Sequence, residues 1–155
     1  MKSVLISINK PHTDNIFTHR KKRVEWRKKP LPKTTHYCYE TKNKGGCGKV
    51  IGQFDVVQNI EFDPLNHRLY SSDFIEDGCV PIEDLIEYAN GDVIYGNILE
   101  NIEGYDTPKE LSEFQQCHKC KHNCVRTSQN VELCKYHRLT RPPQSWCYVE
   151  ERSDR

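Results

Sequence analysis

The residue types best suited to chemistry are gathered in one basic segment, HRKKRVEWRKKPLPK, at residues 19–33. This segment holds eight Lys and Arg and a single acid, Glu25. The alternation in RVEWR predicts a strand on which Arg23, Glu25 and Arg27 share a face. A carboxylate between two guanidinium groups would fix both, and fixed guanidinium groups bind phosphate through paired hydrogen bonds. Lys22 would add a point charge, and it would form an acid/base pair with Glu25 in a cleft dry enough to shift their pKa values.

The residues around this face extend the prediction toward nucleic-acid binding. A path along a phosphate backbone would be continued by Arg20, Lys21, Lys28 and Lys29, and Tyr37 or Tyr39 would supply a ring on which a base stacks. Trp26 alternates with the charged residues and is predicted to belong to the core. The alternative interpretation is a charged sheet edge, because lysine on an edge strand opposes aggregation.

A second group of chemical residues lies near the C-terminus, in CHKCKHNCVRTSQNVELCKYH. Cys117-x2-Cys120 and Cys134-x2-His137 have the paired spacing of zinc modules, in which each pair reaches one tetrahedral ion from a tight turn. We therefore predict a structural zinc site with Cys117, Cys120, Cys134 and a fourth ligand. Cys124 is favoured as that ligand because four-thiolate sites are common, and His137 is the alternative. A surface loop with incidental thiols would also fit the pattern.

Charge is segregated along the chain although the formal net charge is only +1. Residues 1–53 carry thirteen Lys and Arg against three acids, and residues 54–114 carry two against fifteen. This segregation predicts a basic and an acidic face on one folded domain. The longest apolar string, VLISI, is far shorter than the roughly 20 residues of a membrane span and lacks the features of a signal peptide. We therefore expect a cytoplasmic protein in which clustered cysteines bind metal and isolated ones, Cys38, Cys79 and Cys147, are small core residues.

The elements that must position these residues are mainly strands. The patterns predict strands at residues 3–8, 23–27, 35–40, 49–62, 92–105 and 145–151. A short helix is expected after Pro11, and VPIEDLIEYANG predicts a longer one that stops at Gly91. Many strands with two or three helices, in a chain long enough for one domain, indicate a small, mostly β, barrel-like α+β fold.

Four stretches, in this order, resemble the ASCH domain of the PUA-like superfamily. SVLISINKPHTDNIFTHRKKRVEWRK is similar to the opening strand and helix of that family and to its signature, which is close to G-x-K-x-x-E-x-R. Lys22, Glu25 and Arg27 stand in the Lys, Glu and Arg places, whereas Arg20 or Lys21 occupies the turn that carries glycine in the family. HYCYET…GKVIGQFDV, GDVIYGNILENIEGYDTPKELSEF and RPPQSWCYVEE resemble later strands, the last one as in small proteins of bacteria and phages.

The resemblance covers nearly the whole chain and implies a single domain at residues 1–155. Its fold would be a small PUA-like β-barrel with flanking helices, and a zinc-binding insertion at residues 115–138 would precede the last strand. The resemblance further implies binding of RNA, single-stranded nucleic acid or a modified nucleotide in a basic cleft beside Lys22, Glu25 and Arg27, in a regulatory role.

Two alternatives stay open at the level of sequence. One enzymatic branch of the family resembles an amidohydrolase for acetylated cytidine with a catalytic lysine, threonine and glutamate. Because Glu25 occupies the threonine place, that activity is not carried over. Another branch cleaves RNA, so an RNA-acting enzyme using Lys22 and Glu25 is one alternative. The other is a phage-type adaptor that binds a host protein through the zinc segment or the acidic face.

Overall fold

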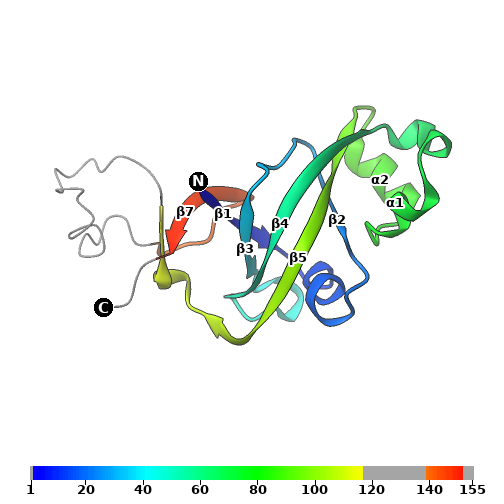
Figure 1. Cartoon of the computed structure of the whole chain (residues 1–155). Helices are drawn as coiled ribbons and strands as arrows, with labels where there is room; N and C mark the ends of the chain where they lie inside the picture. The colour runs from blue at the N-terminus through cyan, green and yellow to red at the C-terminus, as the bar shows by residue number, and fades with distance from the viewer. Residues whose placement is uncertain (1, 117–138, 152–155) are drawn as a thin grey trace.

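The computed structural model describes residues 2–116 and 139–151. Within these ranges one mixed sheet has the strand order β2-β5-β4-β3-β1-β7-β6 (Figure 1). The strands are β1 (Ser3–Ile8), β2 (Val24–Arg27), β3 (Thr35–Glu40), β4 (Lys49–Phe62), β5 (Ile94–Lys109), β6 (Phe114–Gln116) and β7 (Trp146–Glu151). The helices are α1 (Ser72–Glu76) and α2 (Ile82–Ala89), and short helical segments lie at Asp14–Thr18, Asn43–Gly45, Pro64–Leu69 and Leu111–Glu113. The α+β class and the positions of the main strands are therefore confirmed.

The two longest strands form the backbone of the molecule. β4 and β5 pair antiparallel along most of their length and run side by side in Figure 1. Burial alternates along the first half of β4, as expected for a strand with one face in the core. β1 is parallel to β3 and antiparallel to β7, which brings the first and last described strands of the chain together.

The sheet is open, so the predicted closed barrel is wrong. The edge strands β2 and β6 are short and do not pair with one another. The start of β2 is instead hydrogen-bonded to a segment outside the sheet. The amide groups of Arg23 and Val24 both donate to the carbonyl oxygen of Asp77, at 2.7 and 3.1 Å. Asp77 belongs to the linker between α1 and α2, so this linker occupies the edge that closure would need.

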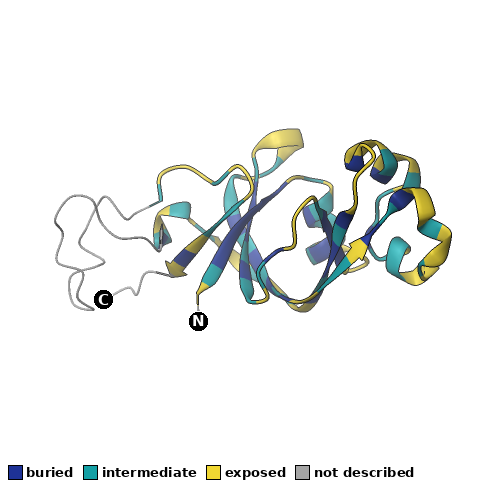
Figure 2. Ribbon diagram, turned by 90° about the horizontal axis from the view of Figure 1, so that it is seen from above, coloured by how far each residue is buried: buried dark blue, intermediate teal, exposed yellow. Residues whose placement is uncertain are grey.

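The core is divided among the middle and the two ends of the sheet. Buried residues of β1, β3 and β4, including Ile6 and Phe54, form the central cluster. A second cluster joins Trp26 on β2 to the two helices, and a third lies around Phe114 and Val149 on β6 and β7. Figure 2 shows the buried positions concentrated in the strands and the exposed ones in the loops. Trp26 is 6% exposed, which confirms its predicted place in the core.

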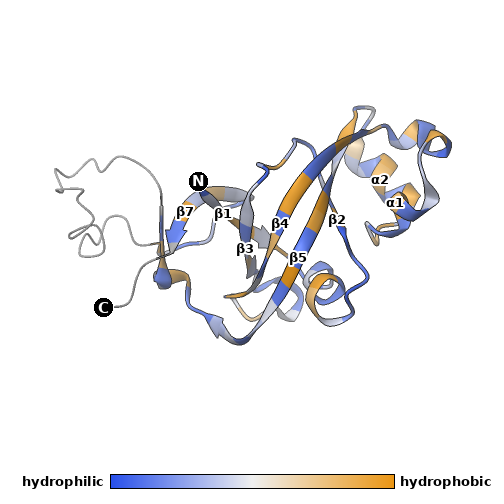
Figure 3. Ribbon diagram, viewed as in Figure 1, coloured by the Kyte–Doolittle hydropathy of each residue, from blue (hydrophilic) through white to orange (hydrophobic). Residues whose placement is uncertain are grey.

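Helix α2 lies where the sequence predicts it and covers one end of the sheet. Leu85 and Ala89 are its buried residues and pack against the Trp26 cluster. Figure 3 shows hydrophobic residues on α2 and on the adjoining parts of β4 and β5. The helix ends at Asn90, which adopts a left-handed conformation with φ of 50°, followed by Gly91 with φ of 87°. In the described ranges, no helix has the length and hydropathy that crossing a bilayer requires.

Candidate functional site

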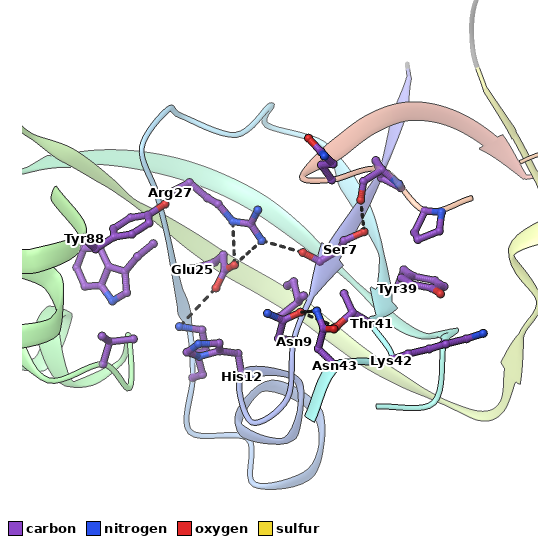
Figure 4. Close-up of a pocket in the computed structure, with 18 of the residues that line it drawn as sticks. Ser7, Asn9, His12, Glu25, Arg27, Tyr39, Thr41, Lys42, Asn43 and Tyr88 are labelled. Carbon is purple, nitrogen blue, oxygen red and sulfur yellow. Dashed lines mark hydrogen bonds and ion pairs between the residues drawn. The ribbon is translucent and has the colours of Figure 1, made fainter. Parts of the chain in front are cut away.

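A cleft of about 1160 Å³ opens beside β2 (Figure 4). Its floor is formed by side chains from the end of β1, the loop that follows it, and β2. One wall comes from the α1–α2 linker and α2, and the other from the loop after β3 and residues 140–144. Elements far apart in sequence therefore meet around the predicted signature.

A buried triad of charges lies in the floor of this cleft. Glu25 is 6% exposed, and Lys22 is 1% exposed. Glu25 Oε2 accepts hydrogen bonds from Arg27 Nη2 at 2.7 Å and from Arg27 Nε at 2.9 Å. Glu25 Oε1 lies 3.5 Å from Lys22 Nζ, which also donates to the carbonyl oxygen of Gly78 at 2.6 Å. Lys22 is thus buried in the site and paired with Glu25, so it is not available as a separate point charge for a phosphate.

Burial and charge pairing act in opposite directions on the triad. Burial lowers the pKa of Lys22, and the nearby Glu25 carboxylate offsets only part of that effect. Burial would raise the pKa of Glu25, but Arg27 and Lys22 outweigh it and lower that pKa below its usual value. Glu25 is therefore a carboxylate at neutral pH, held between two cations.

Arg27 connects three segments of the chain. Besides its contacts with Glu25, its Nη1 donates to Ser145 Oγ at 3.0 Å and its Nη2 donates to the carbonyl oxygen of Ser7 at 3.1 Å. Ser7 Oγ in turn donates to the carbonyl oxygen of Pro143 at 2.7 Å. Four of the five guanidinium N–H groups are used in this way. Arg27 therefore helps to hold the wall at residues 140–144 in place. Its guanidinium group has no pair of free N–H groups with which to bind a phosphate, contrary to the prediction from the sequence.

The remaining basic residues of the signature lie outside the cleft lining. Lys21, Arg23 and Lys28 are all exposed. The expected Arg23–Glu25 pair is not formed, since β2 begins only at Val24 and Lys22 occupies that side of Glu25. Lys28 Nζ instead lies 5.2 Å from the centroid of the Tyr88 ring.

The linker between α1 and α2 explains why Lys22 is buried. Gly78 accepts the hydrogen bond from Lys22 and lies directly against the Trp26 indole, where an added Cβ would be 2.0 Å from Nε1. Only glycine permits this approach. Cys79 follows with φ of 55° and lines the cleft, so it is not the core residue that was predicted. Cys38 is fully buried, which confirms its predicted place, and Cys147 is half-buried against the Phe114 cluster.

Among the aromatic residues that line the cleft, Tyr39 and Tyr88 differ in exposure. Tyr39 was predicted to stack on a base, but only 5% of it is exposed because its ring packs in the Phe114 cluster. Tyr88 on α2 is 38% exposed and was not singled out from the sequence. Of the two, Tyr88 offers the more exposed ring, with Lys28 Nζ over one of its faces.

Several further lining residues also escaped sequence reasoning. His12 lies in the floor with its Nδ1 buried and without a hydrogen-bond partner among the described residues. Burial first and Lys22 second lower the pKa of His12, so its ring is neutral at pH 7. Lys42, Asn43 and Arg141 line the opposite wall. They occupy loops separated by about a hundred residues of sequence, and no local pattern joins them.

Arg20 stands at the place of the glycine in the signature. It has φ of 55°, in the left-handed region that favours glycine.

The predicted zinc ligands Cys117, Cys120, Cys124 and Cys134, and the alternative His137, lie outside the described residues. Among residues 2–116 and 139–151, no group of three or more metal-ligating side chains comes together. The insertion at residues 115–138 and its metal remain a prediction.

The fold of this chain is also found in known crystal structures. The crystal structure of ASCH from Zymomonas mobilis matches with a TM-score of 0.65 and 19% identity, covering 96% of this chain and 88% of that chain. Its serine-to-alanine variant matches with a TM-score of 0.66 and 18% identity, covering 96% of this chain and 89% of that chain. Its tyrosine-to-phenylalanine variant matches with a TM-score of 0.65 and 17% identity, covering 97% of this chain and 91% of that chain. No family model and no curated protein matches the sequence. The chain therefore has the fold of the ASCH domain, as its motifs predicted.

Proposed function

We propose that this chain binds RNA or a nucleotide by seating one nucleoside in the cleft beside Lys22, Glu25 and Arg27, as a regulatory module. The observation that carries the proposal is the combination of a buried, charged floor with apolar and aromatic walls in one cleft. Ligand sites have this composition, in which apolar walls supply contact area and a few fixed polar groups supply specificity. The shared fold with the Zymomonas mobilis ASCH protein supports it.

The geometry favours a seated nucleoside over a track along a nucleic-acid backbone. The triad is buried, and the exposed lysines of the signature do not line the cleft. Glu25 Oε1 has only the Lys22 ammonium beside it, at 3.5 Å, and the partly exposed ring of His12 lines the same cleft. These two groups suit the polar edge of an unstacked base, and single-stranded RNA exposes such edges. A nucleoside in a single strand, at an end or carrying a modification would satisfy the same contacts.

Binding is tested with a panel of nucleosides, nucleoside monophosphates and short single-stranded RNAs, followed by the fluorescence of Trp26 in the cleft. We expect at least one panel member to bind. His12→Ala should weaken that binding about two- to tenfold, the usual effect of one hydrogen bond. His19→Ala is the control, since His19 is exposed and lies outside the cleft. Absence of binding across the whole panel would refute the proposal.

A second candidate function, an enzyme acting on RNA or a modified nucleoside, is favoured by one observation. The Lys22 amine has a lowered pKa and lies 3.5 Å from a carboxylate in the cleft, so the two form a pair able to exchange a proton. Incubation with RNA and with modified nucleosides tests this candidate. Turnover that Glu25→Gln leaves unchanged in a folded variant would exclude it. The host-protein adaptor and the cytoplasmic location stay predictions from the sequence.

A further inference from the structure

We infer that the cleft has a polarity: it orients a nucleotide with its base at the α2 end and its phosphate between Lys42 and Arg141. This inference rests on the proposed function, and it names the groups that distinguish a nucleotide from a nucleoside. It places phosphate recognition on loops far from the basic segment that dominates the sequence.

The first observation is the pairing state of the cations that line the cleft. Four Lys and Arg side chains line it, and two of them, Lys22 and Arg27, are paired with Glu25. The other two, Lys42 and Arg141, are exposed and form no ion pair with any described residue. A phosphate in the cleft would therefore pair with Lys42 and Arg141, whose charges no described acidic side chain neutralises.

The second observation is that both cations belong to the wall of the cleft that lies opposite α2. The aliphatic part of Lys42 lies against Gly48, where an added Cβ would be 2.7 Å from Lys42 Cε. Arg141 is two residues before Pro143, whose carbonyl oxygen accepts the hydrogen bond from Ser7. In Figure 4, Lys42 and Ser7 lie on the side of the triad opposite Tyr88.

The third observation is the different chemistry of the α2 end. Pro81, Leu85 and the exposed ring of Tyr88 form an apolar wall there, beside the edge of Trp26. Asp84, one of the two acidic residues that line the cleft, lies on the same helix. Its carboxylate would repel a phosphate and accept a hydrogen bond from a base, so this end suits a neutral aromatic ring.

The size of the cleft agrees with a complete nucleotide. Its volume of about 1160 Å³ is slightly larger than the roughly 300–1,000 Å³ of pockets that enclose one small-molecule ligand. A base alone would leave one end of the cleft filled with water. The triad would then face the sugar and its link to the phosphate.

The test compares each of the four common ribonucleosides with its 5′- and 3′-monophosphate on the full-length chain. We expect a monophosphate to bind at least tenfold more tightly than its nucleoside. Lys42→Ala and Arg141→Ala should each reduce this advantage several-fold, and the double variant should remove it without changing nucleoside affinity by more than about twofold. Tyr88→Ala should weaken nucleoside and monophosphate equally, by about fivefold or more, because stacking does not depend on the phosphate.

Lys29→Ala is the matched control, since Lys29 is an exposed lysine of the basic segment that does not line the cleft. It should leave both affinities unchanged. All the substituted side chains are exposed, and a thermal melt confirms that each variant is folded. A phosphate advantage that persists in the double variant, or that Lys29→Ala abolishes, would overturn the orientation while leaving nucleoside binding intact. Failure of every ligand to bind would refute the proposed function itself.

Discussion

At the scale of single residues, Glu25 is the centre of the site. It is the one acid in a strongly basic segment, and it lies buried between Lys22 and Arg27. Its role is first structural, because its contact with Arg27 helps hold β2, β1 and the segment before β7 in one arrangement. The lone acid of the sequence is thus the counter-charge that allows two cations to be buried.

Glu25→Gln should therefore lower the free energy of unfolding by about 3 kcal/mol or more, because it leaves two buried cations without a counter-charge. The control is Glu61→Gln, since Glu61 is exposed, and a change within about 0.5 kcal/mol is expected there. Urea denaturation measures both. A loss below about 1 kcal/mol for Glu25→Gln would mean that the triad contributes little to stability.

His36 should make the fold sensitive to acid. Its side chain is fully buried against Phe54, and its pKa is about 4 rather than 6.5, mainly because burial disfavours the charged ring. The unfolded chain therefore binds a proton more readily between about pH 6.5 and 4, and stability falls as the pH is lowered through this window. The shift corresponds to about 3 kcal/mol lost between neutral pH and pH 4.

His36→Phe keeps an aromatic ring packed against Phe54 and removes the imidazole that takes up a proton. We expect the unfolding free energy of this variant to fall less between pH 7 and pH 4 than that of the parent chain. The exposed His19 provides the control substitution, His19→Phe, which should leave the pH profile unchanged. Equal pH profiles for His36→Phe and the parent would show that His36 is not the source of acid sensitivity.

At the scale of elements, the site depends on short connections more than on the strands. The turn before β2 directs Lys22 inward, the α1–α2 linker covers Lys22 and caps β2, and the loop after β3 supplies Lys42. Each connection contains a residue with positive φ: Arg20 in the turn, Cys79 in the linker and Lys44 in the loop. The cleft is therefore formed where the backbone leaves regular structure.

Arg20→Gly should raise the free energy of unfolding by about 0.5–1 kcal/mol. The gain comes from relieving the left-handed conformation, and the greater freedom of glycine in the unfolded chain offsets part of it. Lys21→Gly tests the explanation, because Lys21 is exposed and has an ordinary backbone conformation. That substitution should destabilise by a similar amount. If both substitutions destabilise equally, the turn carries no strain at Arg20.

At the scale of the whole molecule, the chain combines an ASCH-type sheet with a cysteine-rich segment before the last strand. That segment ends next to residues 140–144, which form a wall of the cleft. It has few apolar residues of its own, so a metal would be its main source of order. The predicted zinc ligands are therefore close in sequence to residues that line the proposed binding site.

We expect about one zinc ion per chain when the protein is purified without chelators, as for a closed structural site. Cys120→Ser should lower the zinc content, because it removes a predicted thiolate ligand. Cys47→Ser should not, since Cys47 is an exposed cysteine outside the segment. Elemental analysis of the three proteins decides the question, and a content below about 0.3 zinc per parent chain would contradict the predicted site.

The sequence by itself determined the strands and the helix that build this protein. β-rich composition identifies β1 and β3, alternation identifies the first half of β4, and the apolar stripe and Gly91 identify α2, because all of these signals are local. The signature also identified Lys22, Glu25 and Arg27 as a group. Local pattern was enough for all of these, and the order of the motifs was enough to identify the ASCH-type fold but not its open sheet.

Only the tertiary structure decided which charges are free. Sequence spacing placed Arg23 beside Glu25, whereas the turn and the linker put Lys22 there and bury it. Whether a cation binds a ligand or serves the fold depends on what surrounds it, and burial and pairing arise from contacts between distant segments. For the same reason His12, Lys42 and Arg141, which share no local pattern, become one site only when β1, β3 and the last strand are brought together.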